Sequence, residues 1–438
     1  MIDKEVFDLI RKEEKRQEEG LELIPSENYV SKEVRQALGC ILTNKYSEGY
    51  PRKRYYGGNE VVDEIESLAI KRAKRLFKVP HVNVQPYSGS PANWAVHGAL
   101  CQPGDIILSQ HLSHGGHLSM GQEANLSSKF FHAYYYHLTA DGSVDFKELE
   151  SLAKKIKPKV IWSGGTAYTI KFNFLKYAQI ADQVGAYFVA DIAHIAGLII
   201  GGIHPSPVRY AHLVTTTTHK TLRGPRGGMI MVTKKGLKTD PDLARKIDRA
   251  VFPGLQGGPH DNQIAALAIA LKEASTVKFK EYTRQVVVNA RALARILKRA
   301  DLKLIGNGTE NHMIWVDLTD QGIDGWQVQV ALDVLGISIN RQTIPFDLRP
   351  AYYPSGIRLG TPAVTTRGMK EAQMRLIGDW IIQVINIVRE IKCVGLGSSD
   401  REEDQAARKE FKEKIKLHPH LRHLQKEVKS FCLNFPIP

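Results

Sequence analysis

A lysine and an aspartate each follow an apolar segment with the pattern of a buried strand. Residues 212–219, HLVTTTTH, run into Lys220 and then into the Gly/Pro-rich turn RGPRGG, while residues 185–190, GAYFVA, run into Asp191. Ligands in open α/β sheets bind at the carboxyl ends of strands. A lysine and an acid there suit pyridoxal phosphate, because the lysine can form a Schiff base and the aspartate can pair with the pyridinium nitrogen. A buried Lys–Asp pair followed by a hairpin would give the same pattern.

Two further groups have the chemistry to bind anions. Ser88 and Ser90 flank Gly89 directly after the apolar segment VNVQPY, where a helix is expected to begin. Hydroxyls and free amides at a helix N-terminus bind phosphate, although a serine that only caps the helix has the same pattern. Arg358 stands between two glycines in SGIRLGT. Its planar guanidinium suits a carboxylate, and an exposed ion pair is the alternative.

Three histidines, His111, His114 and His117, recur at every third position in HLSHGGHLS. Zinc is one interpretation of such a run. However, two glycines interrupt it, no cysteine or acid adjoins it, and this spacing needs a regular helix to bring three ligands to one ion. We therefore predict no metal.

Seven segments spread over residues 20–370 together resemble one family. They are LELIPSENYVS, NKYSEGYPRKRYYGG, NVQPYSGSPAN, HGGHL, TTTTHKTL, VFPGLQGGP and SGIRLGTPAVTTRGM. This set, in this order, is similar to serine hydroxymethyltransferase (glycine hydroxymethyltransferase), in which TTTTHKTL carries the cofactor lysine. Several motifs in one order are far more specific than any single motif. The resemblance implies a pyridoxal 5'-phosphate enzyme that reversibly interconverts serine and glycine, with tetrahydrofolate and methylene-tetrahydrofolate as cosubstrates, in one-carbon metabolism and glycine biosynthesis.

The resemblance also implies roles for individual residues. The expected cofactor site, with its Schiff base on Lys220, comprises Lys220, Asp191, His194, His117, Ser88, Gly89, Ser90, Thr166, Gly257 and Gly258. The expected catalytic groups are Lys220, Glu48, Tyr46 and His219. The amino-acid substrate is expected to contact Arg358, Ser26, Tyr56 and Glu48. The folate is expected to contact Leu112, Gly116, His117, Leu118, Tyr55 and Gln342.

Family members use the segment from Tyr46 to Tyr56 across a dimer, and their counterparts of Gly257 and Gly258 contact the neighbouring subunit's phosphate. The resemblance therefore implies a homodimer with shared active sites, with a tetramer as the larger alternative. Two departures concern the folate: Met120 replaces a histidine of GGHLTHG, and Gln342 stands where asparagine is common. Neither touches the covalent chemistry of the cofactor.

Composition is that of an ordinary globular protein. The 438 residues are 43% hydrophobic and 24% charged, with a formal net charge of +14. Such a charge suits either anionic ligands or nucleic acid. The basic residues are dispersed, even in the charged tail 401–429, so we favour a solvated surface and consider nucleic acid unlikely. Four scattered cysteines and a charged start without a signal-type apolar core indicate a cytoplasmic protein, with no membrane association.

Strands and helices alternate after a charged N-terminal helix, whose narrow apolar stripe is Ile2, Val6, Leu9 and Ile10. This alternation predicts an α/β fold with a mostly parallel sheet, and GGMIMVT follows the Lys220 turn too closely to be other than antiparallel. We expect an N-terminal arm (1–55), a large cofactor domain (56–290) and a smaller α/β C-terminal domain (291–438). The order matches the aspartate-aminotransferase-like fold (fold-type I) of the family.

Two alternative functions remain beside the transferase. One is a related pyridoxal phosphate enzyme, either a β-hydroxy-amino-acid (allo-threonine) aldolase or an α-methylserine hydroxymethyltransferase. The other is a basic RNA- or anion-binding protein without catalysis. Cleavage of allo-threonine far faster than of serine would favour the aldolase, and salt-dependent RNA binding without cofactor uptake would favour the binding protein.

Overall fold

The chain forms two compact units, which are described separately. In the computed structural model, residues 3–391 and 393–438 are described. One unit is Val30–Arg284, and the other combines Met1–Tyr29 with Gln285–Pro438. The division at residues 55 and 290 stays a prediction.

A seven-stranded sheet forms the centre of the unit Val30–Arg284, in the order β4-β10-β9-β8-β7-β5-β6. Its strands are β4 (His81–Asn83), β5 (Ile106–Gln110), β6 (His132–Tyr136), β7 (Val160–Ser163), β8 (Tyr187–Asp191), β9 (Leu213–Thr217) and β10 (Gly228–Val232). The pairs β5–β6, β5–β7, β7–β8 and β8–β9 are parallel, whereas β10 is antiparallel to both β9 and β4. The predicted mostly parallel sheet and the antiparallel strand after Lys220 are both confirmed.

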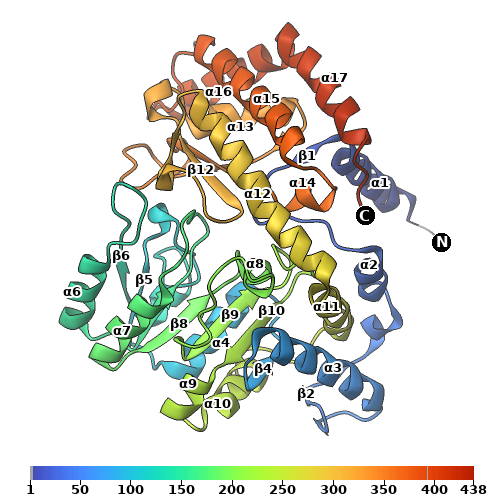
Figure 1. Ribbon diagram of the computed structural model, residues 1–438, viewed down its shortest axis with the longest axis vertical. Helices are drawn as coiled ribbons and strands as arrows, with labels where there is room; N and C mark the ends of the chain where they lie inside the picture. The colour runs from blue at the N-terminus through green and yellow to red at the C-terminus, as the bar shows by residue number, and fades with distance from the viewer. Residues whose placement is uncertain (1–2, 392) are drawn as a thin grey trace. The chain divides into compact units, whose positions relative to one another are not determined.

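Helices cover both faces of this sheet (Figure 1). On one face, α4 (Gly89–Leu100) and α10 (Leu243–Arg249) share a core cluster with Val189 of β8. On the other face, Phe188 stacks on Tyr177 of α7 (Phe174–Val184), with ring centroids 5.6 Å apart, and α6 (Phe146–Ile156) packs on α7. Because successive side chains of a strand point to opposite faces, β8 contributes to both layers and is buried through its middle.

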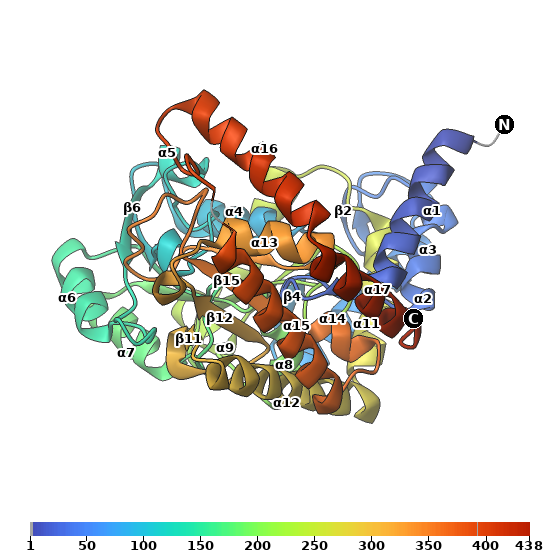
Figure 2. The ribbon, with the colours of Figure 1, turned by 90° about the horizontal axis from the view of Figure 1, so that it is seen from above.

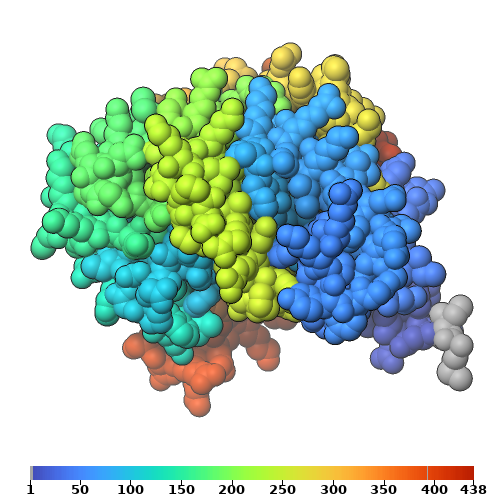
Figure 3. Space-filling model, turned by 90° about the horizontal axis from the view of Figure 1, so that it is seen from below, coloured from blue at the N-terminus to red at the C-terminus, as the bar shows by residue number. Residues whose placement is uncertain are grey.

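A second group of helices lies at the β4 side of the unit: α2 (Lys32–Leu38) and α3 (Glu60–Phe77) both pack on α11 (Asp261–Ala274). Seen from below, the blue segment around 45–75 lies against the yellow-green segment around 240–255 (Figure 3). The hairpin strands β2 (Gly49–Tyr50) and β3 (Lys53–Arg54) belong to that blue segment, and Tyr50 Oη donates to the carbonyl of Asp248 at 2.6 Å. Short α-helices of the unit are α5 (Ser127–Phe130), α8 (Ala196–Ile200) and α9 (Lys234–Thr239).

Between α11 and α12 (Val277–Arg299) the chain leaves the regular helical conformation for two residues. Ser275 Oγ donates to the carbonyl of Lys272 at 2.6 Å, and Thr276 Oγ1 donates to that of Glu273 at 2.7 Å. These side-chain bonds take carbonyls at the end of α11 that a continuous helix would use, so the helix stops there.

A four-stranded antiparallel sheet, in the order β11-β12-β15-β14, forms the centre of the second unit. Its strands are β11 (Lys303–Leu304), β12 (Met313–Asp317), β14 (Asn340–Gln342) and β15 (Gly356–Gly360). Helices α13 (Gly325–Val334), α14 (Pro362–Thr366) and α15 (Glu371–Glu390) accompany it. A separate parallel pair, β1 (Leu21–Glu22) with β13 (Ile337–Ser338), joins the N-terminal segment to this unit.

The charged tail forms two amphipathic helices, α16 (Arg401–Leu417) and α17 (Pro419–Leu433). Their buried side chains, among them Phe411, belong to the core of this unit. Helix α17 lies beside α1 (Lys4–Glu19), where Lys429 and Glu19 form an ion pair at 3.0 Å (Figures 1 and 2). The side chains of the predicted stripe on α1 that are described, Val6, Leu9 and Ile10, are exposed, and Ile2 lies outside the described residues.

Candidate active site

Asp191 and Lys220 line one cavity at the carboxyl ends of β8 and β9. Asp191 is the last residue of β8, and Lys220 follows the end of β9 by three residues. Parallel neighbouring strands bring their carboxyl ends to the same edge of the sheet. The full lining is Gly89, His117, Gly165, Thr166, Asp191, Ala193, His194, Thr217 and Lys220. Six of the residues predicted for the cofactor thus lie together.

The Asp191 carboxylate is held by two hydrogen bonds. The backbone N–H of Ala193 donates to Oδ1 at 2.9 Å, and Asn93 Nδ2 donates to Oδ2 at 2.9 Å. Asn93 Nδ2 also donates to Ser119 Oγ at 2.9 Å, and Ser119 Oγ lies 2.7 Å from Nδ1 of His117. Asn93 therefore links the carboxylate to the ring of His117. Sequence reasoning missed these roles of Asn93 and Ser119, because a contact across 98 positions leaves no local pattern.

Lys220 is buried, and the neighbouring His117 and His219 are half-buried. Lys220 is 8% exposed. Burial, with the positive charges of Lys220 and Arg226, lowers the pKa of His219 to about 3. Burial also lowers the pKa of His117. Both imidazoles are therefore neutral at physiological pH and can act as hydrogen-bonding or stacking groups without adding positive charge beside the lysine.

The loop at the start of α4 fits an anion. Ser88 occupies the N-cap position, yet its side chain makes no capping hydrogen bond. The simple capping interpretation of this serine is therefore wrong, and its hydroxyl is available to a ligand. Gly89 is needed at the next position, because a Cβ there would lie 2.6 Å from Cγ2 of Thr217. Together with the amides at the N-terminus of α4, these residues fit the phosphate of pyridoxal phosphate, and Lys220 with Asp191 fits its ring.

The predicted folate segment adjoins the same cavity. Thr166 Oγ1 donates to the carbonyl of Gly116 at 3.2 Å, so a cavity residue and a predicted folate residue touch directly. Leu112 and Leu118, on either side, are exposed by 37% and 45%. Met120, which replaces the family's histidine, is buried at 1% exposure and packs in the core.

The rings of His111 and His114, two of the histidines considered as zinc ligands, contact each other and the ring of His137. The ring centroids of His111 and His114 are 5.9 Å apart, and the ring of His137, which directly follows β6, lies 4.8 Å from that of His114. Burial and the neighbouring histidines lower the pKa of His114 to about 4. Within the described residues, no cluster of three His, Cys, Asp or Glu side chains has the geometry of a metal site.

A second group of predicted residues forms an exposed loop outside the lining of that cavity. Tyr46, Tyr55 and Tyr56 are exposed by 53%, 76% and 49%, and Tyr46 Oη donates to Glu48 Oε1 at 3.2 Å. Gly257 and Gly258 face Glu48 and the ring of Tyr46. This set is therefore assembled, but apart from Lys220 and Asp191 in the lining of the cavity.

Arg54 ties this loop to the core of the unit. Its Nη1 donates to the carbonyls of Ser47 and Gly49 at 2.8 and 2.9 Å. Its Nη2 lies 2.5 Å from Glu66 Oε2, and its Nε lies 2.9 Å from Asp63 Oδ1, both on α3. Sequence reasoning missed this arginine, although an Arg in a Tyr-rich turn followed by acids at helical spacing is the signal that would have found it.

Arg358, Ser26 and Gln342 belong to the second unit. Arg358 is in β15, 8% exposed, and its Nε donates to Asn340 Oδ1 of β14 at 2.9 Å. Burial lowers the pKa of Arg358 to about 10, which still leaves the guanidinium charged at neutral pH. The segment of Ser26 joins the end of this strand, since the Gly360 N–H donates to the carbonyl of Leu23 at 2.7 Å. Gln342 ends β14.

Comparison with known proteins decides the family. The family model for serine hydroxymethyltransferase matches residues 1–381. A serine hydroxymethyltransferase from Desulfotalea psychrophila (strain LSv54 / DSM 12343) is 49% identical over 436 residues, which are 100% of this chain and 95% of the relative. The enzyme of the same name from Orientia tsutsugamushi (strain Ikeda) is 48% identical over 435 residues, 99% of each chain. One from Acidothermus cellulolyticus (strain ATCC 43068 / DSM 8971 / 11B) is 52% identical over 387 residues, covering 88% and 89%. The chain belongs to the serine hydroxymethyltransferase family.

Membership confirms the resemblance, the fold-type I architecture and the activity expected from it. As a serine hydroxymethyltransferase, the chain is a pyridoxal phosphate-dependent transferase that interconverts serine and glycine with tetrahydrofolate as cosubstrate. The aldolase and the RNA-binding alternatives are not favoured. Among the described residues, no helix combines the length and the apolar character needed to span a membrane.

Proposed function

We propose that the cavity of Lys220 and Asp191 is the cofactor site of this hydroxymethyltransferase. The observation that carries the proposal is the meeting of a buried lysine, a hydrogen-bonded carboxylate and an uncapped serine loop at one edge of the sheet. When bound, pyridoxal phosphate supplies a ring that accepts electrons from the bond broken at Cα. Lys220 holds the cofactor covalently, and Asp191 keeps a proton on its ring nitrogen. Ser88, Gly89 and Ser90 bind the phosphate.

The remaining assignments in this unit are those that the family resemblance implies, and the position of these residues in or beside the cavity supports them. His117 stacks on the cofactor ring, held at Nδ1 by Ser119. Thr166 and His194 contact the phenolic-oxygen side, and neutral His219 adjoins the lysine. Leu112, Gly116 and Leu118 form the folate surface, for which the contact of Gly116 with Thr166 is the support. In the second unit, Arg358 binds the carboxylate of the amino acid, with Asn340 fixing its Nε, and Ser26 and Gln342 complete the substrate and folate contacts.

We assign the exposed loop of Tyr46, Glu48, Tyr55 and Tyr56 to the active site of a partner subunit, together with Gly257 and Gly258. In this assignment Glu48 exchanges a proton with the hydroxymethyl group or the folate. Support comes from the exposure of these tyrosines and their absence from the lining of the chain's own cavity. The protein is then at least a homodimer, with the cytoplasm as its proposed location.

Activity and subunit sharing are tested with one pair of variants. The wild-type protein should convert serine and tetrahydrofolate to glycine, and cleave allo-threonine more slowly; the reverse preference would favour an aldolase. Lys220→Ala and Glu48→Gln should each be inactive alone. After mixing under conditions that exchange subunits, activity should return, because a mixed dimer has one site with both native residues. No recovery, with mixed dimers shown by mass spectrometry, would place Glu48 and Lys220 in the same subunit's site.

A further inference from the structure

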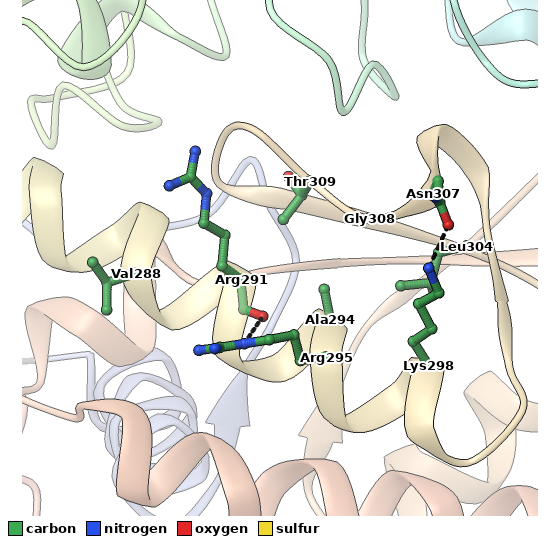
Figure 4. A pocket seen from close by; sticks show the side chains of 9 residues that line it. All are labelled: Val288, Arg291, Ala294, Arg295, Lys298, Leu304, Asn307, Gly308 and Thr309. Carbon is green, nitrogen blue, oxygen red and sulfur yellow. Dashed lines mark hydrogen bonds between the residues drawn. The ribbon is translucent and has the colours of Figure 1, made fainter.

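A cationic pocket lies on the second unit, apart from every residue to which a role has been assigned. It is lined by Val288, Arg291, Ala294, Arg295, Lys298, Leu304, Asn307, Gly308 and Thr309, and its volume is about 420 Å³ (Figure 4). Pockets that bind small molecules have volumes of roughly 300–1,000 Å³. The hollow is therefore large enough for a metabolite.

Positive charge in the pocket comes from one side of α12. Arg291, Arg295 and Lys298 follow one another on successive turns, a span of roughly 10 Å along the helix axis. The lining includes no aspartate or glutamate. An anion in this hollow would be attracted to all three positive charges.

The three cationic side chains differ in their hydrogen-bond partners. Lys298 Nζ donates to Asn307 Oδ1 at 2.6 Å, which ties the helix to the opposite loop, and Arg295 Nε donates to the carbonyl of Arg291 at 3.3 Å. Within residues 3–391 and 393–438, the Arg291 side chain has no hydrogen-bond or ion-pair partner, and in Figure 4 its guanidinium extends away from the helix on the side of Thr309. A guanidinium fork without such a partner has its donors available for the oxygens of a phosphate.

The opposite wall and the floor complete a site for an organic anion. The loop Asn307–Thr309 supplies the amide side chain of Asn307 and the hydroxyl of Thr309, which is hydrogen-bonded to the backbone of Asn311. Gly308, at φ 143°, takes a conformation that favours glycine. Ala294 and Leu304, 4% and 7% exposed, form an apolar floor. An apolar floor beneath a cationic rim fits a molecule with an apolar body and one phosphate group. A nucleic-acid footprint would need a longer basic surface than these three side chains provide.

We propose that this pocket, formed by α12 and the loop Asn307–Thr309, binds a small organic phosphate of the size of a nucleoside monophosphate. The proposal is independent of the catalytic assignment, since none of the lining residues has a role there. Arg291 binds the phosphate, and Arg295 and Lys298 supply further positive charge. Ala294 and Leu304 contact the apolar body of the ligand.

Calorimetric titration of the holoenzyme tests the proposal, with adenosine 5′-monophosphate as the probe. Adenosine and inorganic phosphate, the two parts of that molecule, are titrated separately as controls. We expect saturable binding of the monophosphate, weaker binding of phosphate and none of adenosine. Arg291→Gln should lower the affinity for the monophosphate about tenfold, which is the effect of losing one charge-assisted contact at an exposed site. Arg299→Gln is the matched control, because it removes the same charge from the same helix outside the pocket.

Three results would overturn the proposal. Equal losses from Arg291→Gln and Arg299→Gln would mean that only the general charge of the helix attracts the phosphate. If adenosine bound with the same affinity as adenosine 5′-monophosphate, the cations would have no role in binding. Displacement of the probe by single-stranded RNA, with a steep dependence on salt that Arg291→Gln reduces, would identify a nucleic-acid surface instead. Serine–glycine turnover of both variants should equal that of the wild type, which separates this test from that of the active site.

Discussion

Replacing Arg54 by methionine should destabilise the protein more than any other single change in the exposed tyrosine loop. Arg54 donates to the carbonyls of Ser47 and Gly49 and pairs with Asp63 and Glu66 on α3. The side chains of Arg54 and Glu66 are only 4% and 1% exposed. Methionine fills the space but leaves the Glu66 carboxylate buried without a counterion. Breaking a buried ion pair from one side costs about 3–5 kcal/mol.

The cost should depend on pH in a defined direction. Burial raises the pKa of Glu66 even with Arg54 and Gln85 beside it, and loss of Arg54 raises that pKa further. An acid whose pKa is higher in the folded than in the unfolded state favours folding at low pH. That contribution is lost as the pH rises through the folded-state pKa. The deficit of Arg54→Met relative to wild type should therefore be largest near pH 8 and shrink towards pH 5.

Urea unfolding at pH 5 and pH 8, at one fixed protein concentration, measures this effect. Lys53→Met is the matched control, because it removes a positive charge from an exposed position of the same hairpin. Adding Glu66→Gln to Arg54→Met should recover stability at pH 8 and flatten its pH dependence. A loss below about 1 kcal/mol, within the range of surface ion pairs, would refute the reasoning. An equal loss at both pH values would refute it as well.

Three further changes test other parts of the structure. Asn93→Leu removes the hydrogen bond that holds Asp191, so cofactor affinity, measured by equilibrium dialysis, should fall about 10- to 100-fold; unchanged affinity would separate Asn93 from the site. Arg358→Lys keeps the charge but loses the planar fork and the bond to Asn340, so KM for serine should rise about tenfold in steady-state assays while KM for tetrahydrofolate stays the same; equal rises in both would contradict a carboxylate role. Trp162→Ala, at a site with 0% exposure, should lower the free energy of unfolding by about 3–5 kcal/mol in urea, and a loss under 1 kcal/mol would contradict its place in the core.

Sequence reasoning succeeded where a local pattern carried the structure. Strands β8 (YFVAD) and β9 (LVTTT) consist mostly of apolar and β-branched residues because the sheet buries them, and the turn after β9 placed Lys220 at a strand end. Strand β6, HAYYY, was missed, because at the edge of the sheet it alternates between exposed and half-buried side chains without an apolar run. The two helices of the charged tail were missed for the same reason: each buries only a narrow stripe among many charges.

The residues of the candidate site also divide into those that a local sequence pattern predicts and those that it does not. Lys220, Asp191 and the Ser88 loop were predictable, since each follows a strand directly. Arg54 was overlooked although its partners Ser47 and Glu66 are only 7 and 12 positions away, so the pattern of acids after it could have been used. Asn93 was not predictable, because its partner is set by the packing of distant segments: it contacts Asp191 across 98 positions. Such positioning residues become visible only when the fold brings the segments together.

The lysine that carries the cofactor is the most direct test of the central claim. Holoenzyme would be reduced with borohydride, which makes the lysine–cofactor bond permanent, then digested and analysed by mass spectrometry. The assignment predicts one phosphopyridoxyl group per chain, on Lys220 in the peptide TTTTHKTLR. A label on another lysine, or reduction without any label, would contradict the site described for this chain.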